Sequence, residues 1–177
     1  MNHDYRSSGI LLAVSSLPGP YGIGSLGRPA RQFVDFLAEA GQHIWQVLPL
    51  VPPGEGSSPY MSPSAFAGNP LFIDLDELAA EGLLAPHELD GQRYENPDRV
   101  DYGHLAKTRM PLLRLAFQRS RQSLCPQEDP DLPWLGDYAQ FAALRVKYQV
   151  PYWEWPADAQ PDPEEVEFQE FLQNTFY

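Results

Sequence analysis

The sequence predicts an α/β protein that begins with a strand–helix–strand unit and continues as a mostly helical chain. A short aliphatic run at Ile10–Val14 stops at Ser and Pro-Gly, which is typical of a buried strand. A second run, Ile44–Leu48, ends at Pro49. Between them, an amphipathic segment starts near Pro29 and ends at Gly41, as a helix does. A helix between two such strands predicts that the strands are parallel.

Helical patterns fill most of the chain after the second strand. They cover Leu78–Glu81, Leu105–Ser120, Trp134–Tyr148 and the segment from Pro163 to the end. Asp74 or Asp76 is placed to cap the first of these helices, and Gly82 to end it. Pro111 is expected to limit the first turn of the second helix. The third helix is expected to bury a stripe made of Tyr138, Phe141, Ala142 and Arg145.

The last helix begins with clear start signals. Asp162 is a good N-cap, Pro163 a good first residue, and Glu165 has the spacing of a capping box. The acidic cluster Asp162–Glu167 is interpreted as a solvated helix start. The pattern continues to Tyr177 without a C-cap, and two parallel strands alone do not make a stable sheet. The sequence therefore predicts a truncated part of a larger α/β protein.

Charge and composition exclude several classes of partner. The 177 residues carry 24 Asp and Glu against 12 Lys and Arg, a formal net charge of −12. A field of that sign repels nucleic acid, and no cluster of basic residues offsets it. No stretch approaches the ~20 apolar residues that span a bilayer. The single cysteine, Cys125, forms no internal disulfide. We expect a soluble cytoplasmic protein without nucleic-acid or membrane partners, and no protein partner is implied.

Three other patterns in the sequence resemble functional motifs but favour structural interpretations. The run GIGSLG at Gly22–Gly27 matches a dinucleotide fingerprint, but SSLPGPY separates it from the strand that it should follow directly. The four histidines show no metal-ligand spacing, so neither a cofactor nor a metal is expected. The aromatic run PYWEWP at Pro151–Pro156 predicts a small satellite core under a turn, with a stacking surface as the alternative.

The segment Gly54–Ile73 is the strongest functional candidate. Past Glu55 it carries no charge until Asp74, yet it is rich in hydroxyl, amide and aromatic side chains. It follows the second strand at its carboxyl end, where parallel sheets and barrels place ligand sites. Sugars need such neutral hydrogen-bonding groups and flat rings. The candidate contacts are Ser57, Ser58, Tyr60, Phe66 and Asn69. The alternative is a rigid Pro/Ser loop that packs on itself.

Four stretches of the chain carry a family resemblance: SGILLAVSSLPGPYGIGSLG, FVDFLAEAGQHIWQVLPL, SSPYMSPSAFAGNPLFIDLDELAAEGLL and VDYG. Together they resemble the start of 4-α-glucanotransferases of the amylomaltase (maltodextrin disproportionating enzyme) family. The match is dense from Arg6 to Leu84 and patchier afterwards. The resemblance implies the N-terminal portion of a (β/α)₈ TIM barrel with a mostly helical inserted subdomain. Residues 1–84 would hold the first strands and helix with an active-site loop at 49–70, residues 85–160 the insertion, and 161–177 the start of a helix.

The resemblance also implies a reaction. The family transfers 1,4-α-glucan segments between maltooligosaccharides with retention, through a covalent glucosyl-enzyme, and such chemistry needs two closely spaced carboxylates. In the family these acids lie on later barrel strands, so no residue of this chain is expected to be catalytic. Other hypotheses are a non-catalytic glucan-binding module and, more weakly, a nucleotide-binding α/β domain.

Substrate contacts can be carried over at a few positions. Ser58 and Tyr60, in S-P-Y, match family positions that hold the glucose next to the scissile bond. Tyr102, in V-D-Y-G, matches an aromatic position that contacts glucan away from the cleavage point. Ser25 departs from the family's usual Asp, and Glu55 stands where an aromatic residue can occur. An acid cannot stack on a sugar, so Glu55 argues against an accessory glucan site.

Overall fold

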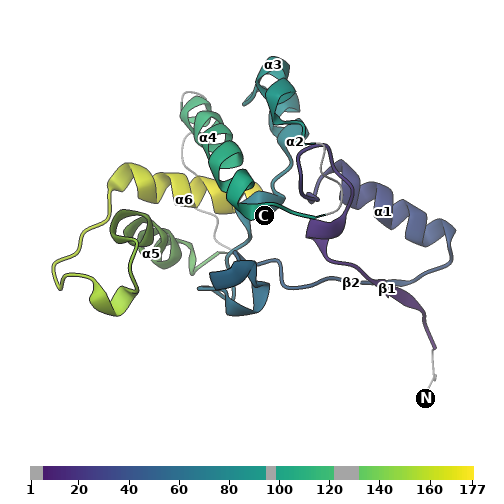
Figure 1. Cartoon of the computed structure of the whole chain (residues 1–177), viewed down its shortest axis with the longest axis horizontal. Coiled ribbons are helices and arrows are strands. Elements are labelled where there is room, and N and C mark those ends of the chain that lie inside the picture. Colours follow the sequence, from purple (N-terminus) through teal and green to yellow (C-terminus); the bar gives the residue numbers. More distant parts are fainter. Residues whose placement is uncertain (1–5, 95–98, 122–131) are drawn as a thin grey trace.

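A parallel pair of short strands opens the fold, as the sequence predicts. The computed structural model describes residues 6–94, 99–121 and 132–177, so Cys125 lies outside the described residues. Strand β1 (Gly9–Leu11) pairs with β2 (Ile44–Gln46), and Gly9 stands opposite Ile44. Helix α1 (Arg28–Glu39) connects them and lies along one side of the pair (Figure 1). The ring of Phe33 meets that of Trp45 edge to face, with centroids 5.0 Å apart, so this side is packed.

Both strands are shorter than predicted. The backbone N–H of Leu12 donates to the carbonyl of Gln46 at 3.0 Å, and the chain then leaves the ladder. Val14–Ser16 forms a 3₁₀ turn, in which Val14 is buried in a core with Leu17 and Ile23. The prediction of a buried run is therefore wrong for its first half, because Ile10 and Leu11 are 42% and 59% exposed. It holds at Val14, which packs in a turn rather than in the sheet.

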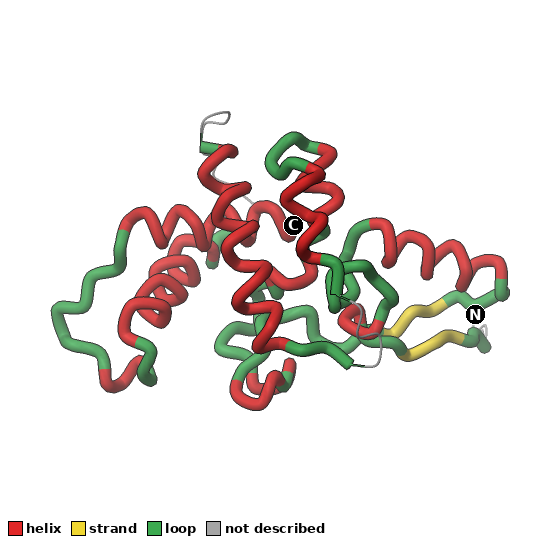
Figure 2. Tube along the Cα trace, turned by 45° about the horizontal axis from the view of Figure 1, so that its top comes forward, coloured by secondary structure: helices red, strands yellow, loops and turns green. Residues whose placement is uncertain are grey.

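The helical half of the molecule gathers away from the strands (Figures 1 and 2). It contains α2 (Leu75–Ala80), α3 (Pro86–Leu89), α4 (Tyr102–Ser120), α5 (Leu135–Tyr148) and α6 (Pro163–Phe176). Its core includes Leu113 and Phe117 of α4 and Phe168 and Leu172 of α6, all almost fully buried. Among the described residues, no helix is long and apolar enough to cross a membrane.

The predicted caps of α2 are confirmed. The carboxylate of Asp74 accepts hydrogen bonds from the backbone N–H groups of Asp76 and Glu77, at 2.9 and 3.3 Å. Asp74 rather than Asp76 is therefore the N-cap. The helix ends before Gly82, whose φ of +78° is the left-handed conformation that glycine adopts at helix ends.

Two predictions about the longer helices are wrong. Helix α4 starts earlier than predicted because Asp101 caps it, accepting from the N–H of His104 at 2.9 Å, and Pro111 therefore lies in the helix interior. Helix α5 does not bury the predicted stripe. Its buried residues are Leu135, Ala139 and Ala143, because small side chains let α5 approach α6 closely. In the predicted stripe, Tyr138 and Phe141 are half-buried and Arg145 is exposed.

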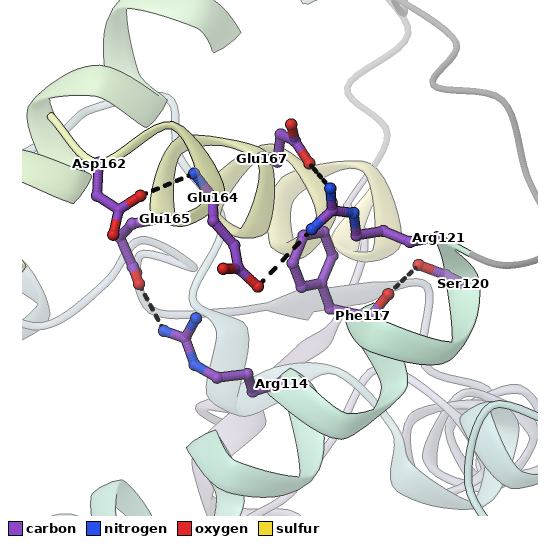
Figure 3. A network of polar contacts seen from close by, with 8 residues as sticks. All are labelled: Arg114, Phe117, Ser120, Arg121, Asp162, Glu164, Glu165 and Glu167. Atoms are coloured by element: carbon purple, nitrogen blue, oxygen red, sulfur yellow. Dashed lines mark hydrogen bonds and ion pairs between the residues drawn. The ribbon is translucent and has the colours of Figure 1, made fainter.

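Charged side chains join α4 to α6 across the core (Figure 3). Glu165 accepts from Arg114 at 2.6 Å, and Arg121 lies 3.7 Å from Glu164 and 3.3 Å from Glu167. The predicted capping box is wrong, because Glu165 reaches across to α4 instead of back to its own helix end. Asp162 does cap α6, as predicted, by accepting from the N–H of Glu164 at 3.0 Å. The acidic cluster is thus partly an inter-helix contact rather than only a solvated helix start.

Candidate functional site

A cavity of about 140 Å³ lies at the carboxyl ends of the two strands. Its wall is built by the residues that follow β1, those that follow β2, the loop after β2, and the first residue of α4. The sequence placed its functional candidate at this edge, and the structure puts a hollow there. In open parallel sheets and barrels this edge is the usual location of a ligand site.

The lining of the cavity is neutral. Eight of its residues are aliphatic, proline or phenylalanine, and four carry hydroxyl or amide groups: Ser15, Ser57, Asn69 and Tyr102. Neither a carboxylate nor a cationic side chain is among the lining residues in the part of the chain that the structure describes. Such a surface suits an uncharged ligand with hydroxyl groups and apolar faces, and it offers no general acid or nucleophile. The volume is below the ~300–1,000 Å³ of a typical small-molecule pocket.

The loop 49–70 packs its backbone on itself while two of its aromatic rings face outwards. The Ser64 hydroxyl accepts hydrogen bonds from the N–H groups of Phe66 and Ala67, at 3.1 and 3.0 Å. Two 3₁₀ turns, Glu55–Ser57 and Pro59–Met61, shape its first half. The rings of Tyr60 and Phe66 remain 73% and 63% exposed. The two alternatives for this loop, that it packs on itself and that it faces a ligand, are therefore compatible. Its backbone packs on itself, and its rings remain available to a ligand.

Of the three substrate contacts carried over from the family, the cavity lining includes one. Tyr102 lines the cavity from the start of α4. Ser58 and Tyr60 do not line it, although their neighbours Ser57 and Pro59 do. Ser58 is half-buried, and its carbonyl accepts from Gly54 and Met61, so it holds the turn that presents Tyr60.

Ser15 is a lining residue that no sequence motif indicated. It follows the first strand, as the loop follows the second, and its place in the chain was the available signal. Asn69 was predicted as a contact, and the structure shows a second task for it. Its side-chain oxygen accepts from the N–H of Leu71 at 3.0 Å, and its own N–H donates to the carbonyl of Leu50 at 2.8 Å. The second bond closes the base of the loop.

A cluster of charged groups braces the fold behind the cavity. Arg109, 2% exposed, donates to the carbonyl of Ile73, and burial lowers the pKa of its guanidinium to about 10. Ser25 donates to the carboxylate of Asp74 at 2.6 Å. Burial, together with a hydrogen bond to Asp76, raises the pKa of Tyr21. These contacts tie the GIGSLG turn and α4 to the start of α2, which is a structural task.

The remaining motifs have structural explanations in the described residues. Within GIGSLG, Gly22 has φ +77°, and a Cβ on Gly27 would overlap the carboxylate of Asp74. In PYWEWP, the predicted satellite core forms only in part. Trp155 donates to the carbonyl of Val150 at 3.0 Å and packs against Phe141, whereas Tyr152 and Trp153 are 64% and 71% exposed. No group of three or more His, Cys, Asp or Glu gathers in metal-binding geometry within the described ranges.

Comparison with known proteins agrees with this architecture. Residues 12–176 match the 4-alpha-glucanotransferase family, glycoside hydrolase family 77. The 4-alpha-glucanotransferase of Thermus thermophilus is 46% identical over 164 residues, which is 85% of this chain and 31% of that protein. That of Synechocystis sp. is 42% identical over 192 residues, or 96% of this chain and 38% of that protein. The chain belongs to the 4-alpha-glucanotransferase family.

A solved structure extends the likeness to three dimensions. The amylomaltase from Streptococcus agalactiae, in complex with acarbose, is 32% identical and superposes with a TM-score of 0.86. The match covers 98% of this chain and 39% of the amylomaltase. The chain thus spans about a third of the length of the relatives it matches. The predicted family is confirmed, and the α/β architecture with a parallel strand pair agrees with it.

Proposed function

We propose that the whole protein is a cytoplasmic 4-α-glucanotransferase that transfers 1,4-α-glucan segments between maltooligosaccharides. In this proposal β1 and β2 are the first two strands of a (β/α)₈ barrel, and residues 85–160 belong to its helical insertion. The observation that carries the substrate class is the neutral cavity at the carboxyl edge of the strands, beside exposed aromatic rings. Family membership supports the reaction class.

The chemistry is proposed to follow the retaining route. A carboxylate attacks the sugar carbon and forms a covalent glucosyl-enzyme, while a second carboxyl group protonates the leaving oxygen and later activates the acceptor hydroxyl. We assign both acids to residues outside 1–177, because the cavity lining described above contains no carboxylate. Residues 1–177 alone are then expected not to transfer glucan.

The role proposed for this chain is to hold the glucan, with Tyr60 beside the bond that is cleaved and Tyr102 away from it. Tyr102 contributes a ring and a hydroxyl inside the cavity. Tyr60 contributes an exposed ring on a turn that Pro59, a residue of the cavity lining, stiffens. The high exposure of Tyr60 argues against a packing role, since a ring in the core would be covered.

The test is a pair of substitutions at Tyr60 in the complete protein. Tyr60→Phe removes one hydroxyl, which costs about 0.5–1.5 kcal/mol, so kcat/KM on maltotriose should fall roughly three- to tenfold. Tyr60→Ala also removes the stacking ring, so it should cost on the order of 2–4 kcal/mol. Tyr152→Ala is the matched control, because Tyr152 is 64% exposed on a similar 3₁₀ turn, Tyr152–Glu154, that contributes no residue to the cavity lining, whereas the turn of Tyr60 contributes Pro59.

Two results would overturn these assignments. Transfer of glucan by purified residues 1–177 would show that an acid pair lies within this chain. Unchanged kinetics of Tyr60→Ala, with a melting temperature several degrees lower, would assign Tyr60 to packing.

A further inference from the structure

The loop that carries Ser58 and Tyr60 is held by a side chain from the far end of the chain. The side-chain amide of Gln173, on α6, accepts from the N–H of Gly68 at 2.7 Å and donates to the carbonyl of Gly68 at 3.1 Å. A carboxamide presents a donor and an acceptor side by side, so it satisfies both backbone groups of one residue. Gln173 is fully buried, with 0% of its surface exposed.

Two neighbouring residues also contact the loop: Phe176 at the end of α6 and Tyr177 directly after it. We call the contacts of Gln173, Phe176 and Tyr177 with the loop the clamp. The ring of Phe176 lies directly against Gly68, where a Cβ would overlap it. The hydroxyl of Tyr177 donates to the carbonyl of Phe66 at 2.6 Å. The returning arm of the loop (residues 62–70) is therefore fixed to the end of the chain at Phe66 and at Gly68.

In the part of the chain that the structure describes, no backbone hydrogen bond ties the outgoing arm of the loop (residues 49–61) to an α-helix. Its backbone hydrogen bonds join Gly54, Ser57, Ser58 and Met61 to one another. The base of the loop is closed by the bond between Asn69 and Leu50. Since the base is closed and the outgoing arm is bonded to itself, the orientation of the whole loop depends on where its returning arm is held.

We propose that Gln173 is a positioning residue for glucan binding, acting through Gly68 on the loop that presents Tyr60; this rests on the proposed function. Loss of the amide leaves a buried N–H and a buried carbonyl of Gly68 without partners. The loop relieves this by moving its returning arm toward water, which displaces Ser57 from the cavity wall and Tyr60 with it.

The experiment compares two buried glutamines of one helix. Gln173→Met keeps the length of the side chain and removes both hydrogen bonds to Gly68. Gln169→Met is the control, because Gln169 is also buried but its amide bonds to Glu165 within the same helix, at 2.9 Å. For both variants of the complete protein, amide hydrogen exchange is measured over residues 50–69, together with kcat and KM on maltotriose.

We expect Gln173→Met to speed exchange in residues 57–69 at least tenfold and to raise KM about tenfold, with kcat within twofold of the parent. Gln169→Met should leave loop exchange and KM unchanged, even if both variants melt a few degrees lower. Equal loop exchange in the two variants, or faster exchange in Gln173→Met with an unchanged KM, would overturn the proposal. If the parent protein neither binds nor transfers maltotriose, the proposed function itself fails, whatever the exchange data show.

Discussion

Two phenylalanines on two helices show how differently the halves of this molecule are packed. Phe168 of α6 is 1% exposed and lies 5.5 Å from the ring of Phe117, centroid to centroid. Phe36 of α1 is 59% exposed, although its neighbour Leu37 is 5% exposed. The helical half closes its own core, whereas the strand half leaves apolar side chains of α1, β1 and β2 uncovered.

The strand side of this contrast extends to the sheet. Ile10 and Leu11 of β1 and Ile44 of β2 are all at least 42% exposed. Parallel strands are normally covered on both faces, and exposed apolar patches of this kind mark surfaces that other structure covers. The difference teaches that the strand pair positions the edge at which the candidate site lies, but contributes little to the stability of the fold. We expect the helical half to carry most of the free energy of unfolding.

The largest expected effect tests that expectation directly. Phe168→Ala should lower the free energy of unfolding by about 3–5 kcal/mol, because it opens a cavity in a closed core. Phe36→Ala should change it by less than about 1 kcal/mol, since the ring is already largely in water. Urea unfolding of both variants of residues 1–177 measures the difference. A comparable loss in Phe36→Ala would mean that α1 is covered in solution and that the contrast is wrong.

A smaller effect is expected at the joint between the halves. Ser25 donates to the buried carboxylate of Asp74 across 49 residues of sequence. Ser25→Ala should cost about 1.5–3 kcal/mol, because a hydrogen bond to a charged group is lost in a buried site. Ser120→Ala is the control, since that buried hydroxyl bonds a carbonyl of its own helix, and about 1 kcal/mol is expected. Thermal unfolding of both variants measures the difference. If both lose the same free energy of unfolding, the hydrogen bond between Ser25 and Asp74 stabilises the fold no more than one within a helix.

The smallest effect lies within the helical half and depends on pH. The guanidinium of Arg119 and the backbone N–H of Ala85 lower the pKa of Glu88 to about 2 from an ordinary value near 4.5. A depressed carboxyl pKa stabilises the folded state above pH 4.5, and this contribution is lost as pH falls towards 2.

Glu88→Gln should therefore be less stable than the parent at neutral pH and converge with it near pH 2. In an Arg119→Met background the difference should shrink but persist, because Ala85 still donates to Glu88. Unfolding curves collected from pH 7 to pH 2 test this. A gap between Glu88→Gln and its parent that stays constant over this range would show that Glu88 does not act through its charge.

Local signals in the sequence predicted the elements that depend on near neighbours. Asp74, Asp162 and Gly82 act as predicted because a cap requires only the residues of its own turn. The parallel order of the strands also followed from a local pattern, one helix between two aliphatic runs.

The failures concern contacts between distant segments. The buried face of α5 is set by how closely α6 approaches, so the small residues Ala139 and Ala143 outrank the larger ones. Glu165 has the spacing of a capping box, but Arg114 of α4 provides a charged partner that local sequence does not reveal. In the candidate site, Tyr102 was found through family resemblance, whereas Gln173 gave no signal because glutamine on a helix is ordinarily a surface residue.

The separation of the two partners in the clamp has a consequence for the order of events during synthesis. Gly68 and Gln173 are 105 residues apart. At about 5–20 residues per second, a ribosome completes the glutamine roughly 5–20 s after the glycine. The strand pair can form within that interval, but the loop has no amide to close on until α4 and α5 have already been made. A nascent chain stalled before residue 173 should therefore present this loop to proteases, and release of the completed chain should protect it.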